Sequence, residues 1–117
     1  MTIAPNTLVT TLWLHEQLNA KPEASQLRIV DIRGKVLPPT DPQPQYHSHR
    51  AAYEESHIPG AVFVDWITDI TQAGPDHMQI APPDKFAALM GNLGIGAQTF
   101  VVAYDDAGGM LAARLWW

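Results

Sequence analysis

The 117-residue chain contains no cysteine. This absence excludes a disulfide framework, a cysteine-ligated metal and a thiol nucleophile within the chain. Basic residues are also few, with 7 Lys and Arg against 12 Asp and Glu and a net charge of −5. We therefore expect no nucleic-acid partner, because proteins that bind nucleic acid carry concentrated positive charge. No apolar run approaches the roughly 20 residues that span a membrane, so a membrane partner is not expected either.

The composition that remains is typical of one ordered domain. Hydrophobic residues make up 46% of the chain and charged residues 16%, which is far from the composition of disordered segments. We predict a domain over residues 7–117, preceded by an N-terminal extension over residues 1–6. The extension lacks the basic and apolar stretches of a signal peptide, and a cytoplasmic location is expected.

Strand and helix patterns alternate along the chain. Apolar, β-branched runs predict buried strands over residues 27–32, 61–64 and 99–104. Apolar positions at helical spacing predict helices over residues 11–20, 51–56, 84–93 and 110–117. Residues 7–10 fit either a short strand or an extended segment, and a cluster of prolines predicts an unpaired loop over residues 34–49. The alternation predicts an α/β fold with a mainly parallel sheet between helices.

Three of these segments carry motifs that resemble the rhodanese family. They are Val30-Asp31-Ile32-Arg33, His57-Ile58-Pro59-Gly60-Ala61 and Val101-Val102-Ala103-Tyr104. Pro82-Pro83 before Phe86, and Asp105-Asp106 before Gly108-Gly109, extend the resemblance over essentially the whole chain. The resemblance implies a three-layer rhodanese-like fold, with the last strand of the domain missing from this chain.

In an active rhodanese domain the third of these strands leads to the cysteine that carries sulfur. Here Asp105 occupies that position, so the resemblance implies no catalytic residue in this chain. The segment that follows resembles a degenerate active-site loop, in which two carboxylates would repel an anionic sulfur donor. Its residues are Asp105, Asp106, Ala107, Gly108, Gly109 and Met110.

The same motifs resemble the N-terminal, non-catalytic half of a tandem-domain sulfurtransferase. Such an enzyme moves a sulfane sulfur from thiosulfate or 3-mercaptopyruvate to a thiophilic acceptor and needs no cofactor. The resemblance implies two kinds of partner, a missing C-terminal catalytic rhodanese domain and small sulfur-containing substrates. Because the last predicted helix stops at Trp116 and Trp117, we interpret the chain as a fragment. The alternative is a stand-alone, non-catalytic rhodanese-like module with a binding or regulatory role.

The motif residues themselves have structural interpretations. We expect Asp31 and Arg33 to tie the turn formed by His57, Pro59 and Gly60 to the neighbouring loop through charge-assisted hydrogen bonds. His57 is interpreted as a hydrogen-bonded turn histidine rather than a catalytic base. Gly60 after proline fits a turn that requires positive φ.

Two further residues are candidates for an interdomain or substrate contact. His77 resembles a loop histidine of the family, and Arg114 lies on the helix after the degenerate loop. For Arg114 we favour an ion pair with one of the two loop carboxylates over substrate binding. His47 and His49 lack a third ligand at suitable spacing, so no metal site is predicted.

Overall fold

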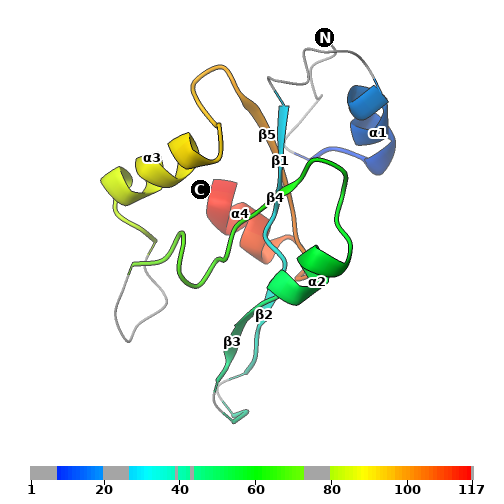
Figure 1. The fold of residues 1–117 in the computed structure, drawn as a ribbon. Coiled ribbons are helices and arrows are strands. Elements are labelled where there is room, and N and C mark those ends of the chain that lie inside the picture. The colour runs from blue at the N-terminus through cyan, green and yellow to red at the C-terminus, as the bar shows by residue number, and fades with distance from the viewer. Residues whose placement is uncertain (1–7, 20–26, 39, 43, 73–79, 117) are drawn as a thin grey trace.

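Three parallel strands form the centre of the fold (Figure 1). The computed structural model describes residues 8–19, 27–38, 40–42, 44–72 and 80–116. Strand β1 (Leu27–Asp31) lies between β4 (Val62–Phe63) and β5 (Phe100–Tyr104). Asp31 is in register with Phe63 on one side and with Tyr104 on the other, so the three strands end together. The predicted α/β fold with a parallel sheet is confirmed.

Four helices lie where the apolar spacing predicted them. They are α1 (Thr11–Asn19), α2 (Arg50–Glu55), α3 (Pro83–Asn92) and α4 (Met110–Trp116). The hydroxyl of Thr10 accepts the Trp13 N–H at 3.0 Å and so caps α1. Proline in the first turn of α3 donates no N–H, which suits a position where the helix has no carbonyl to receive it.

The sheet is covered on both faces because its side chains alternate between two apolar clusters. Ile29 and Val102 pack with Leu14 of α1. Val30, in contrast, packs with Leu111 of α4 on the opposite face. Figure 1 shows α1 and α4 on the two sides of the strands. The arrangement has three layers, as the sequence predicted.

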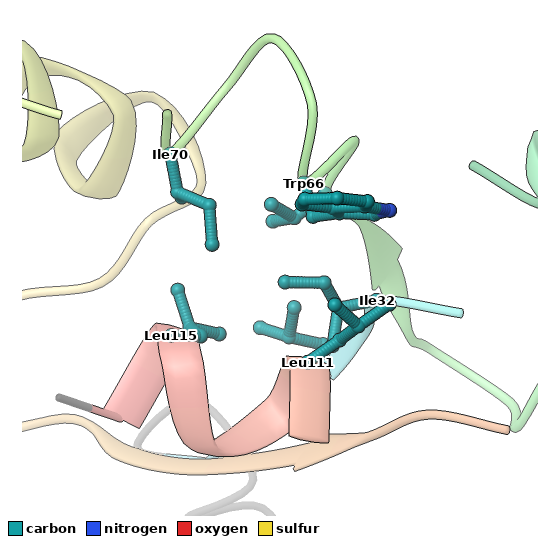
Figure 2. Packing of buried hydrophobic residues seen from close by; sticks show 7 residues of the cluster. Ile32, Trp66, Ile70, Leu111 and Leu115 are labelled. Carbon is teal, nitrogen blue, oxygen red and sulfur yellow. The ribbon is translucent and has the colours of Figure 1, made fainter. Parts of the chain in front are cut away.

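Helix α4 is short and depends on packing. Figure 2 shows Leu111 and Leu115 pointing from α4 toward Trp66 and Ile70, with Ile32 beside them. Ile32 is fully buried and Leu111 is 1% exposed. Burial of each such side chain contributes about 1.5–3 kcal/mol. Because isolated helices of this length are unstable in water, these contacts hold α4 against the sheet.

The prediction of an unpaired loop over residues 34–49 is wrong at both ends of that segment. Strand β2 (Gly34–Val36) pairs with β3 (Tyr46–Ser48) in an antiparallel hairpin that projects from the body of the protein (Figure 1). The described prolines of this segment, Pro38, Pro42 and Pro44, all lie between the two strands. They therefore interrupt no hydrogen bond of the ladder.

The described residues at the start of the chain form no strand. Residues 8–10 lie outside regular structure before α1, which agrees with the extended alternative. Within the described residues, β5 therefore has β1 as a neighbour on one side only. Residues 1–6 and Trp117, about which the sequence made predictions, lie outside the described residues. None of the helices in the described part is long and apolar enough to cross a membrane.

Candidate functional site

The carboxyl ends of the three parallel strands bring the sequence motifs to one edge of the sheet. Ligands of open α/β sheets bind at such an edge. Asp31 ends β1, Asp65 lies two residues after the end of β4, and Asp105 follows β5 directly. The shared register of Asp31 and Tyr104 places two of the motifs next to each other.

Asp105 binds the backbone of its own loop. Its Oδ1 accepts the N–H of Ala107 at 3.0 Å and of Gly109 at 2.8 Å, and its Oδ2 accepts the N–H of Ala112 at 2.7 Å. Gly108 and Gly109 both have positive φ, at 71° and 91°, and this turns the chain back toward the carboxylate. The loop thus closes around a side chain of its own.

These contacts set the protonation of Asp105. Partial burial, the largest single effect, raises its pKa. The N–H groups of Ala112, Ala107, Gly109 and Leu111 lower it, and together they exceed the effect of burial. The net pKa of Asp105 lies below its ordinary value. The carboxylate is therefore a stable anion at neutral pH, inside the ring of donors.

Asp106 points away from that ring and binds the hairpin. Its Oδ1 accepts the Gly34 N–H at 3.1 Å, and its Oδ2 lies 2.8 Å from Nδ1 of His49. The Asp106 side chain is 42% exposed and that of His49 is 28% exposed. Two consecutive aspartates thus serve different parts of the fold.

Asp31 and Arg33 form the polar centre of this edge. The buried carboxylate of Asp31 accepts Arg33 Nε at 3.0 Å and the hydroxyl of Tyr104 at 2.8 Å. Arg33 Nη2 donates to the Ser56 carbonyl at 2.7 Å, and the Tyr104 hydroxyl accepts the Ile58 N–H at 3.2 Å. The hydrogen bond to Asp31 is the largest of the effects that raise the pKa of Arg33. For Tyr104, burial is the main cause of a raised pKa.

The turn that Arg33 reaches is built around His57. The Nδ1 atom of His57 lies 2.7 Å from the Tyr53 carbonyl, and the two rings stack with centroids 4.0 Å apart. Pro59 is exposed, and Gly60 has a φ of 82°, as a tight turn requires. These contacts give His57 the geometry of a turn residue.

The remaining sequence-predicted residues lie elsewhere. Arg114 donates from Nη2 to the Thr71 hydroxyl at 3.3 Å. The contacts described for Asp105 are with the backbone and those for Asp106 are with the hairpin. The ion pair favoured for Arg114 stays a prediction. His77 lies outside the described residues. Met110 opens α4 with 51% of its side chain exposed.

The described residues contain no group of three His, Asp or Glu side chains that could hold a metal ion. His47, one of the two histidines weighed for this role, lies 3.0 Å from the Pro44 carbonyl through Nε2. The other, His49, pairs with Asp106.

Sequence reasoning missed Tyr104 and His49 as members of this network. Tyr104 is 73 residues from Asp31, and His49 is 57 residues from Asp106. For Tyr104 a signal existed, since it ends a strand that was predicted to belong to the same parallel sheet as the strand carrying Asp31. For His49 the prediction of an unpaired loop hid the hairpin that brings it to Asp106.

Comparison with known proteins agrees with the motifs. Residues 10–117 match the family model described as Rhodanese-like domain. The chain is 34% identical over 112 residues to thiosulfate sulfurtransferase of Rattus norvegicus. It is 37% identical over 113 residues to 3-mercaptopyruvate sulfurtransferase of Homo sapiens. In both cases the match covers 94% of this chain. A putative thiosulfate sulfurtransferase of Synechococcus elongatus is 36% identical over 92% of it.

The relatives are longer than this chain. It spans 35% of the rat protein, 36% of the human protein and 28% of the cyanobacterial one. The similarity therefore corresponds to about one third of each sulfurtransferase.

Proposed function

Because the chain belongs to the rhodanese-like domain family, we propose that it is the cysteine-less half of a sulfurtransferase. In this proposal a second rhodanese domain supplies the thiolate, and the complete protein transfers sulfane sulfur from thiosulfate or 3-mercaptopyruvate to a thiophilic acceptor. The names of the relatives support both donors.

The proposal depends mainly on the state of the Asp105 loop. A sulfur-carrying loop needs a thiolate and free N–H groups for the charge of the transferred group. Here the chain has no thiol, and the N–H groups of Ala107, Gly109 and Ala112 already bind the Asp105 carboxylate. The loop is complete without a ligand, which favours a structural role.

The chemistry assigned to the second domain is a two-step displacement. Its thiolate attacks the outer sulfur of thiosulfate, the S–S bond breaks, and sulfite leaves with the electron pair. The acceptor then attacks the outer sulfur of the resulting persulfide, and the thiolate leaves. This half would contribute a rigid sheet edge, fixed by the bonds among Asp31, Arg33 and Tyr104, against which the catalytic domain packs.

Thiocyanate formation from cyanide tests the proposal. The 117-residue chain is compared with the product of the complete reading frame, each with thiosulfate and with 3-mercaptopyruvate as donor. We expect turnover by the longer protein only, with the preferred donor identified by the faster rate. A cysteine-to-serine variant of the second domain is the control and should abolish turnover.

Two results would contradict this function. Turnover by the purified 117-residue chain would show that sulfur transfer here needs no cysteine. Inactivity of the complete protein with both donors would favour the alternative, a stand-alone rhodanese-like binding or regulatory module.

A further inference from the structure

Asp106 joins two parts of the chain that are far apart in sequence. It follows Asp105 in the loop after β5, and its carboxylate binds the base of the β2–β3 hairpin. Gly34 is the first residue of β2, and His49 follows the last residue of β3. Asp106 contacts both, at 3.1 Å and 2.8 Å. One side chain therefore holds both ends of the hairpin.

The base of the hairpin is itself well fixed. The His49 N–H donates to the Arg33 carbonyl at 3.0 Å, and Gly34 pairs with Ser48. The Trp66 indole donates to the His47 carbonyl at 2.8 Å, on the buried side of the hairpin. A two-stranded hairpin is barely stable alone. Its position relative to the sheet therefore depends on these contacts, on the Ser48–Asp65 hydrogen bond and on the packing of Tyr46 against Trp66.

The loop on the other side of Asp106 has little room to adjust. A single peptide bond joins Asp105, which binds the backbone of the loop, to Asp106, which binds the hairpin. The hydrogen bonds of Asp105 are 2.7–3.0 Å long, so a shift of about 1 Å would break them. A movement of the hairpin base that carries Asp106 with it must also disturb the donors around Asp105.

We propose that Asp106 is a positioning residue that couples the β2–β3 hairpin to the loop after β5. Displacement of the hairpin, or loss of the His49–Asp106 contact that holds Asp106 in place, loosens the Asp105 loop. The described residues between the two strands, 37, 38, 40–42, 44 and 45, project from the body of the protein (Figure 1). The coupling is independent of sulfur transfer and goes beyond the function proposed above.

Amide hydrogen exchange, measured by NMR on the full chain, tests the coupling. The reporters are the N–H groups of Ala107 and Ala112, which donate to Asp105 and not to the hairpin. The N–H of Ile32, bound to the Tyr104 carbonyl in the sheet, measures global opening. Exchange of each reporter is expressed relative to Ile32.

His49→Leu removes the imidazole donor. We expect it to accelerate exchange at both reporters about tenfold, the size of effect that follows from losing one charge-assisted hydrogen bond. His49→Asn places an amide nitrogen near the position of Nδ1 and should restore exchange to within about twofold of wild type. His47→Leu is the matched control, because this neighbouring imidazole bonds within the hairpin, to Pro44. It should leave both reporters unchanged.

Asp106→Ala is the second variant and removes the contact from the side of the loop. It deletes the carboxylate that binds both the Gly34 N–H and His49. We expect at least the acceleration seen for His49→Leu. The proposal is overturned if Ala107 and Ala112 keep their wild-type exchange in whichever of the two variants folds. It is also overturned if His47→Leu accelerates them equally.

Discussion

Replacing Asp105 with asparagine tests how much the loop depends on its own carboxylate. The asparagine oxygen can keep the bonds to Ala107 and Gly109, because both end on one carboxylate oxygen. Its amide nitrogen, however, would face the N–H of Ala112, where Oδ2 now accepts at 2.7 Å. A half-buried hydrogen bond to a charged group contributes about 1.5–3 kcal/mol. We therefore expect Asp105→Asn to lower the free energy of unfolding by about 2 kcal/mol at pH 7.

The effect should depend on pH in a defined direction. Burial raises the pKa of Asp105 but the backbone donors lower it more, so the folded-state pKa lies below 3.8. As pH falls, the unfolded chain takes up the proton first, and the stability contributed by Asp105 decreases. The difference between wild type and Asp105→Asn should stay constant at neutral pH. This difference in the free energy of unfolding should decrease below about pH 4 and disappear below the folded-state pKa of Asp105.

Urea unfolding at low micromolar concentration measures this difference. Tryptophan fluorescence is a suitable signal because Trp66, with 3% of its area exposed, lies in the core. Glu54→Gln removes an exposed carboxylate from α2 and is the control. It should change stability by less than about 0.5 kcal/mol. The reasoning is refuted if Asp105→Asn matches wild type at pH 7, or if the difference persists unchanged at pH 2.5.

Three further substitutions have expected outcomes. Burial, followed by the contact with Asp31, raises the pKa of Tyr104 above 10. The stability that the Tyr104 hydroxyl contributes is therefore complete below pH 10 and is lost as pH rises through the raised pKa. Tyr104→Phe should cost about 2 kcal/mol at pH 7, and urea unfolding should show that the variant lacks this alkaline loss. Gly34→Ala would place its methyl group 2.7 Å from the Trp66 indole nitrogen, which should cost about 2 kcal/mol or more in the same assay. Within the described residues one edge of β5 is unpaired, and we expect such an edge to favour self-association. Val101→Lys puts a charge on β5 at a residue that is 38% exposed and should reduce this association in sedimentation velocity, whereas unchanged association would show that this strand is not the contact.

The sheet was predictable from sequence because its strands are continuous apolar runs. Ile29 and Val30 point to opposite faces and are both buried. Such a strand is distinguished from its surroundings by composition alone. The hairpin was not predictable in this way. Its strands are three residues long, and contacts from Trp66 and Asp106, distant in sequence, hold its base.

The location of the site could be predicted from the sequence, but its hydrogen-bond contacts could not. The position of Asp105 after an apolar strand indicated a loop at the carboxyl edge, and the pair Gly108-Gly109 indicated a tight return of the chain. The ion pair proposed between Arg114 and a loop carboxylate stays a prediction. The backbone N–H groups that bind Asp105 were not predicted, although they lie only two to seven residues away and compete with arginine for a carboxylate.

The two aspartates of the loop explain why a site without a nucleophile can keep a defined shape. A loop that binds an external anion leaves its N–H groups unsatisfied when the ligand departs, and that cost limits how rigid the empty loop can be. Asp105 removes this cost by providing the anion from within the chain, while Asp106 fixes the outside of the same loop to the hairpin. The loop can then be rigid in the absence of any ligand. Under the function proposed above, this domain presents a constant surface to a catalytic partner and needs this property, whereas a sulfur-carrying loop must keep its donors free for the incoming group.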